Sequence, residues 1–156
     1  REFINIVSIL RTPYLVLDNE MITALILAQE SGVDVRIITP YIPDKWYVHT
    51  VTHSNYPVLV QAGVRIYEFE PGFIHSKTII ADDEIGIVGT TNFDFRSFYL
   101  HFENGIYMYK SKAVMQVKND YDQMMNQCIE ITPEKCKTTL LKKFILSVMK
   151  LFSPFL

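Results

Sequence analysis

A short stretch near the middle of the chain holds the residues best suited to chemistry on a phosphate. His75 and Lys77 are two positions apart, so in an extended segment their side chains share one face, with Cα atoms about 6.5 Å apart. An imidazole can attack phosphorus or protonate a leaving alkoxide near neutral pH. An ammonium and an amide N–H can neutralise the non-bridging oxygens, and Lys77 and Asn92 fit those two roles. This arrangement requires no metal and no cofactor.

The elements around these residues must bring Asn92 back beside His75. Gly89-Thr90-Thr91-Asn92 follows an apolar segment that ends at Val88, and glycine with small polar residues favours a turn. Hydrophobic periodicity, caps and breakers predict the other elements. We expect strands at 7–11, 33–39, 64–69 and 105–109, helices at 20–29, 46–61 and 113–128, and a hairpin of 77–81 with 85–88. Asp18 is the expected N-cap of the first helix, and Pro57 is expected to interrupt the second. This βαβαβ order predicts an α/β fold with a mixed, largely parallel sheet flanked by helices.

Length and composition limit the classes of protein that the chain can be. Its 156 residues, 49% of them hydrophobic, suit one folded domain. We assign this domain to residues 1–132, with a C-terminal amphipathic helix and tail at 133–156. The net charge of −2 argues against a nucleic-acid partner. Cys128 and Cys136 form no CxxC pair, which favours a reduced, cytoplasm-facing setting. The start at Arg1 is typical of a fragment that lacks an upstream half.

Six positions of the central stretch carry a family resemblance. His75, Lys77, Asp82, Gly89, Thr90 and Asn92 follow the order H-x-K-x4-D-x6-G-T-x-N, which resembles the HKD motif of the phospholipase D superfamily. The flanking segments TPYLVLDNE (12–20), AGVRIYEFEPGFIHSK (62–77) and GTTNFDFRSFYLHFE (89–103), and the closing LFSPFL, are similar to those of bacterial cardiolipin synthases. The chain therefore resembles the C-terminal catalytic half of such an enzyme, with a phospholipase D-like sandwich fold.

The resemblance implies roles for further residues. Glu103 stands where family members carry the glutamate that orients the motif histidine. Asp82 belongs to the motif, although its place in the predicted hairpin favours a structural turn. Thr90 and Arg96 are implied substrate-binding residues, and an ion pair is an equally good role for Arg96. His101 stands where these synthases usually have asparagine.

The implied reaction joins two phosphatidylglycerol molecules into cardiolipin and releases glycerol. In that family one motif histidine forms a phosphatidyl-histidine, and the other protonates glycerol and then deprotonates the second lipid. His75 is the expected general acid and base, which makes the missing N-terminal HKD half a partner. The implied location is the cytoplasmic side of a bacterial membrane.

The C-terminal segment suggests how such a domain would meet the membrane. Apolar residues from Leu141 to Phe152 share one helical face, and residues 134–156 hold five Lys and one Glu. This pattern suits an anionic membrane surface, and packing on the chain's own sheet is the other interpretation.

Other functions stay open at this point. One is a single-motif phosphodiesterase, nuclease or phospholipase D that builds its site as a homodimer. Another is a non-catalytic lipid-binding module. His49 and His53 are spaced to face one metal ion, but no third ligand of suitable spacing follows them in the sequence.

Overall fold

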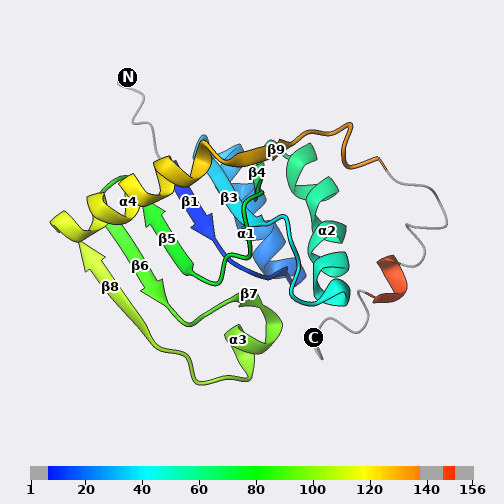
Figure 1. Ribbon diagram of the computed structural model, residues 1–156, viewed down its shortest axis with the longest axis horizontal. Coiled ribbons are helices and arrows are strands. Elements are labelled where there is room, and N and C mark those ends of the chain that lie inside the picture. The colour runs from blue at the N-terminus through cyan, green and yellow to red at the C-terminus, as the bar shows by residue number, and fades with distance from the viewer. Residues whose placement is uncertain (1–6, 138–145, 150–156) are drawn as a thin grey trace.

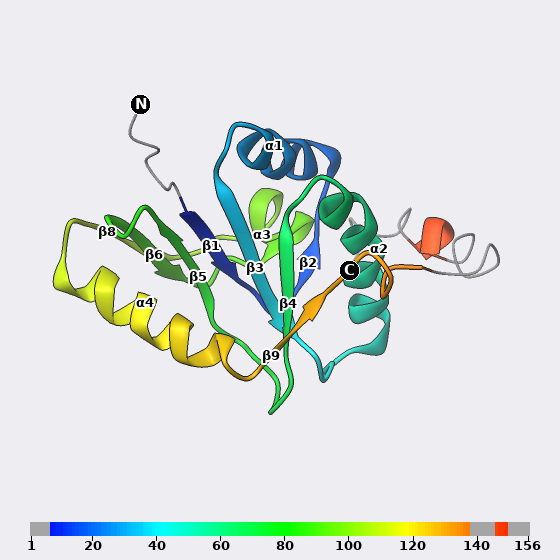
Figure 2. The same ribbon diagram turned by 90° about the horizontal axis from the view of Figure 1, so that it is seen from above.

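One mixed sheet between two layers of helices is the main feature of the computed structural model, which describes residues 7–137 and 146–149 (Figure 1). The two layers lie on opposite faces of the sheet, α1 and α2 on one and α4 on the other (Figure 2). The elements are β1 (Val7–Arg11), β2 (Leu15–Val16), α1 (Asn19–Glu30), β3 (Asp34–Pro40), α2 (Trp46–Gln61), β4 (Arg65–Phe69), β5 (Lys77–Ala81), β6 (Ile85–Gly89), β7 (Phe93–Asp94), α3 (Phe95–Tyr99), β8 (Gly105–Tyr109), α4 (Lys112–Met125) and β9 (Cys128–Ile131).

The sheet is less parallel than the sequence predicts. Its order is β8-β6-β5-β1-β3-β4-β9. Only β1 with β3 and β3 with β4 pair in parallel, whereas the other four pairings are antiparallel. Strands β1, β3 and β4 form the parallel part, which is the βαβαβ unit that the sequence pattern predicts. Parallel neighbours need a crossover connection, and each connection here contains a helix. The expectation of a mixed α/β sheet is thus confirmed, and "largely parallel" is corrected to three of its seven strands.

The central strands are buried on both faces because their alternate side chains enter two different cores. Leu10, Ile37 and Ile66 pack under α1 and α2. Their neighbours Ile9, Ile38 and Tyr67 pack under α4, together with Val114 and Tyr121 of that helix.

Helix α1 begins and ends as its sequence predicts. The side chain of Asp18 accepts a hydrogen bond of 2.8 Å from the backbone N of Met21, which satisfies one of the free N–H groups of the first turn. Gly32 adopts a φ of 95° after the helix, a conformation that favours glycine. Helix α2, by contrast, continues through Pro57. Tertiary packing of its buried residues outweighs the one hydrogen bond that proline removes.

The end of the described domain differs from its prediction. Helix α4 stops at Met125, and Cys128, which was expected in that helix, begins the edge strand β9 beside β4. Most of the predicted C-terminal amphipathic helix lies outside the described residues, but residues 146–149 are helical and Met149 packs against Val16, Val48 and Val51. Within the described ranges, no helix is long and apolar enough to cross a membrane.

Candidate active site

Strand register brings three distant segments to one edge of the sheet. Lys77 pairs with Gly89 in the β5–β6 ladder, and Gly89 pairs with Gly105 in the β6–β8 ladder. The residues just outside these three positions therefore meet at the same end of their strands, the end at which β1 and β3 also terminate. They are His75, the loop after Gly89, and Glu103.

His75 and Lys77 are in direct contact at this edge. The Nζ atom of Lys77 lies 3.2 Å from both Nδ1 and Nε2 of the His75 ring, and it donates a hydrogen bond of 2.7 Å to the His75 carbonyl oxygen. Lys77 is 9% exposed, whereas His75 is exposed. Burial lowers the pKa of Lys77, and the charges of Glu103 and Asp94 oppose this effect. A phosphoryl oxygen bound by Lys77 would thus lie beside the imidazole.

The loop that carries Asn92 is held by its neighbours in space. The backbone N of Asn92 donates to Oγ of Ser97 at 3.2 Å, and the Ser97 backbone N donates to Asp94, the N-cap of α3. Phe93 donates from its backbone to Oγ1 of Thr12 at 3.2 Å. The side-chain Oδ1 of Asn92 is buried and has no hydrogen-bond partner among the described residues. This oxygen is an acceptor, so the group of Asn92 that can donate to a phosphoryl oxygen is its side-chain NH2.

Glu103 contacts this loop rather than the ring of His75. The hydroxyl of Thr90 donates to Oε2 of Glu103, and Nδ1 of His101 lies 3.7 Å from Oε1. The Thr90 hydrogen bond is the main cause that lowers the pKa of Glu103, so the carboxylate is charged at neutral pH. The described residues show no hydrogen bond between Glu103 and His75, and the orienting role of Glu103 stays a prediction.

The structure separates Asp82 from the other predicted site residues but places Arg96 in a cavity with Asn92. Asp82 occupies the turn between β5 and β6, where Asp82 and Asp83 have φ values of 56° and 58°. It is at the opposite end of β5 from Lys77, roughly 16 Å away along the strand, so the structure does not bring it to His75. Arg96 is exposed on α3 and lines a cavity of about 220 Å³ with Asn92, Lys45 and His101.

Sequence analysis missed the residues that support this site from a distance. Thr12 and Asp94 are buried polar residues, and they anchor the Asn92 loop through Phe93 and Ser97. The sequence offered a signal for both, because Thr12 and Asp94 lie in the segments that resemble cardiolipin synthases.

Gly89 must be glycine because β8 approaches it closely. A Cβ atom there would lie 2.5 Å from the Asn104 carbonyl oxygen and 2.9 Å from Cα of Gly105. We expect Gly89→Ala to force β6 and β8 apart and to lower the free energy of unfolding by about 1–3 kcal/mol in chemical denaturation. Gly72→Ala is the matched control, since a Cβ there meets no atom within 4 Å. Equal stability of the two variants would contradict the close approach.

Comparison with known proteins places the whole arrangement in a family. A family model described as "Cardiolipin synthase, PLD-like domain" matches residues 7–125. The cardiolipin synthase of Alkalihalophilus pseudofirmus is 40% identical over 146 residues, which are 93% of this chain and 29% of that protein. The chain spans less than a third of the length of the curated relatives it matches.

Two solved structures share the fold. The phosphatidylserine synthase of Haemophilus influenzae superposes with a TM-score of 0.73 at 19% identity, over 96% of this chain and 42% of that chain. Nuc of Salmonella typhimurium, a phospholipase D family member, superposes with a TM-score of 0.70 at 18% identity, over 81% of this chain and 82% of that chain. The fold thus occurs both as part of a longer chain and as most of a short one.

Proposed function

Because this chain belongs to the PLD-like domain family of cardiolipin synthases, we propose that it supplies one HKD half of a phosphatidyltransferase that makes cardiolipin from two phosphatidylglycerol molecules. The observation that carries the proposal is the contact of Lys77 with the His75 ring at 3.2 Å. An acid or base and a phosphate-binding cation are then side by side at one end of β5.

In the proposed first step, a nitrogen of the histidine in the other HKD half attacks phosphorus of phosphatidylglycerol. The N–P bond forms as the P–O bond to glycerol breaks, and protonated His75 gives its proton to the glycerol oxygen. In the second step neutral His75 takes the proton from a hydroxyl of the second lipid. That oxygen attacks phosphorus, the N–P bond breaks, and cardiolipin leaves.

Lys77 and Asn92 have the complementary task of binding the phosphoryl oxygens. Negative charge builds on these oxygens in the pentacoordinate state, so donors fixed there stabilise that state more than the substrate. The pKa of Lys77 is lowered by burial, and a poorly hydrated ammonium is a strong partner for an anion once the phosphate is bound. The hydroxyl of Thr90 donates a hydrogen bond to Glu103, and the charge of Glu103 acts on Lys77. This negative charge is then available to a protonated histidine.

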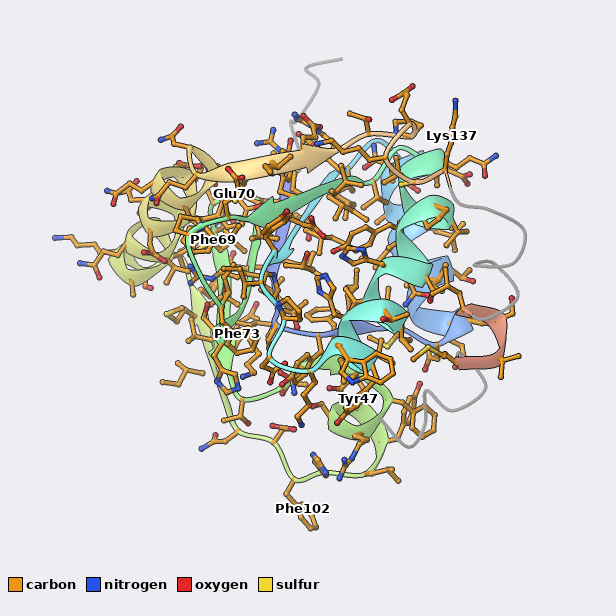
Figure 3. The ribbon with its side chains drawn as sticks, turned by 45° about the vertical axis from the view of Figure 1, so that its right-hand side comes forward. Tyr47, Phe69, Glu70, Phe73, Phe102 and Lys137 are labelled. Carbon is orange, nitrogen blue, oxygen red and sulfur yellow. The ribbon has the colours of Figure 1, made fainter. Side chains whose placement is uncertain are left out.

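A lipid substrate fits the apolar surface next to the site. Phe98, Tyr99, Leu100 and Phe102 follow the Asn92 loop, and each is at least 46% exposed. Phe102 points away from the domain (Figure 3). Such a group of exposed apolar side chains is typical of a surface that faces lipid or a partner, and we propose that it faces the lipid substrate.

The first test offers phosphatidylglycerol to the natural polypeptide that carries this sequence and, separately, to residues 1–156 alone. We expect cardiolipin and glycerol in equal amounts from the natural polypeptide, with lipid products identified by mass spectrometry, and neither product from residues 1–156 alone.

The other outcomes contradict the proposal in distinguishable ways. Phosphatidic acid in place of cardiolipin would identify a phospholipase. Cardiolipin from residues 1–156 alone, together with a dimer in light scattering, would favour the single-motif homodimer that the sequence leaves open.

A further inference from the structure

A second group of ionisable side chains lies between α2 and β4, in elements that the proposed reaction does not use. His49 and His53 are one turn apart on α2, with ring centroids 4.0 Å apart. Glu68 of β4 faces them, and its Oε1 lies 2.7 Å from Nε2 of His53. One donor atom from each of the three residues lies within 4.8 Å of the other two. The sequence shows the histidine pair, and only the fold supplies the carboxylate.

The carboxylate of Glu68 is buried between α2 and β4, where a nearby positive charge would stabilise it. Glu68 is 4% exposed, and a buried carboxylate is costly unless a positive group balances it. In the described part of the chain, no lysine or arginine nitrogen lies within ion-pair distance of it. Its other partner is the neutral hydroxyl of Tyr56, which donates to Oε1 at 3.1 Å. A protonated histidine or a metal ion can supply the balancing charge.

The direction of the His53 ring favours a metal over a proton. Nε2 of His53 is close to Glu68, yet the contact does not have hydrogen-bond geometry, so within the described residues this buried nitrogen has no hydrogen-bond partner. An ion bound by both atoms would satisfy both.

We propose that His49, His53 and Glu68 bind one Zn²⁺ ion. Two imidazoles and one carboxylate are a donor set that zinc accepts, with a fourth position left for water. Three donors around tetrahedral zinc lie about 3.3 Å apart. To bind the ion, Nε2 of His53 and Oε1 of Glu68 must therefore separate from their present 2.7 Å, while the three donor atoms already lie within 4.8 Å of one another.

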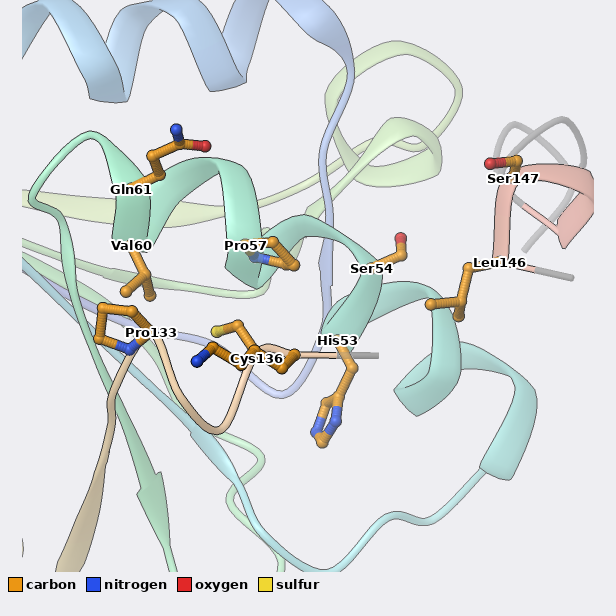
Figure 4. Close-up of a pocket in the computed structure, with 10 residues that line it drawn as sticks. His53, Ser54, Pro57, Val60, Gln61, Pro133, Cys136, Leu146 and Ser147 are labelled. Atoms are coloured by element: carbon orange, nitrogen blue, oxygen red, sulfur yellow. The ribbon is translucent and has the colours of Figure 1, made fainter. Parts of the chain in front are cut away.

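The surroundings of the three ligands fit a metal site. The hydroxyl of Tyr56 holds Glu68 and lies 2.7 Å from Oγ1 of Thr39, which is the kind of support that orients a metal ligand. A cavity of about 350 Å³ lined by His49, His53 and Glu68 leaves room for the fourth ligand. His53 also lines the adjoining groove of about 860 Å³, whose lining includes residues of α2, Pro133, Cys136 and Leu146 (Figure 4). A bound ion would tie α2 to β4 at this groove.

The test measures metal binding directly and needs no lipid, so its result is independent of the proposed reaction. The natural polypeptide is freed of metal with a chelator and titrated with Zn²⁺ by calorimetry, and with Co²⁺ by visible absorption. We expect one ion per chain and the intense Co²⁺ spectrum of tetrahedral coordination. A 100-fold excess of Zn²⁺ over Kd should raise Tm by roughly 5–10 °C. No binding, or no such spectrum, would overturn the proposal and leave a His53–Glu68 ion pair only.

Variants locate the ion. His49→Gln and His53→Gln change partly exposed side chains, so they test the ligands without a loss of core packing, and each should weaken Zn²⁺ binding on the order of 100-fold. Glu68→Gln should do the same in a chain that still folds. His101→Gln removes a histidine elsewhere and should leave binding unchanged. Cys136→Ser tests a thiol that lines the cavity outside the donor group, and weakening by it would overturn the three-residue ligand set.

Discussion

His75→Ala in the natural polypeptide is expected to lower kcat for cardiolipin formation at least about 10³-fold, because the proposed acid and base is removed from both steps. His75 is exposed and lies before β5, so the substitution removes little packing. We therefore expect an unchanged thermal melting curve beside the loss of turnover.

Ser76→Ala is the matched control for this change. Ser76 is the next residue, and its side chain points to the opposite face of the extended segment. Turnover of this variant should stay close to that of the unsubstituted enzyme. Residual turnover of His75→Ala above a few per cent would contradict the assignment of His75.

Lys77→Met is expected to reduce kcat about 10²–10³-fold, the size of effect that follows removal of one preorganised donor to an oxyanion. The change keeps most of the aliphatic stem in its buried position and removes only the charge. Because burial lowers the pKa of Lys77, the folded state does not depend on that charge, and we expect stability in chemical denaturation to be retained. Lys77→Arg should restore little activity, since a planar guanidinium does not fit a position that is 9% exposed.

The pH–rate profile provides an independent check on Lys77. Only the ammonium form neutralises the phosphoryl oxygens, so activity should fall as pH rises through its pKa. The lowered pKa places this basic limb below the value of 10.5 for an ordinary lysine. Lys110 is an exposed lysine that follows β8 at the end opposite to Gly105 and pairs with Glu84. Lys110→Met should change neither the rate nor the profile. A rate loss in Lys110→Met as large as that in Lys77→Met would contradict a specific role.

Local sequence signals predicted the elements that local forces determine. Asp18 caps α1, Gly32 follows its end, and the strand at Val7–Arg11 has the predicted limits. Each of these depends on neighbouring residues in the chain, such as a cap hydrogen bond or a glycine conformation. At the end of α4, where pairing with a distant strand decided the outcome, the prediction was wrong. Cys128 belongs to β9 because Ile131 pairs with Ile66, a contact that no local pattern contains.

The candidate site divides in the same way. The spacing of His75 and Lys77 already placed both on one face of an extended segment, and the structure shows them in contact. The path by which Asn92 and Glu103 reach them depends on the register of Lys77 with Gly89 and of Gly89 with Gly105. Strand register is set by side-chain packing over the whole sheet, so the sequence named Asn92 from its donor group and the expected turn after Gly89, and Glu103 from family resemblance, without knowledge of this register.

By itself, then, the sequence determined which residues are candidates for phosphate chemistry, because residue type and short spacing are properties of the chain. Only the tertiary structure decided that Glu103 contacts Thr90 and that Glu68 faces His49 and His53. Both results share one physical reason. Each joins elements whose relative position is set by burial of apolar side chains in the two cores on either side of the sheet.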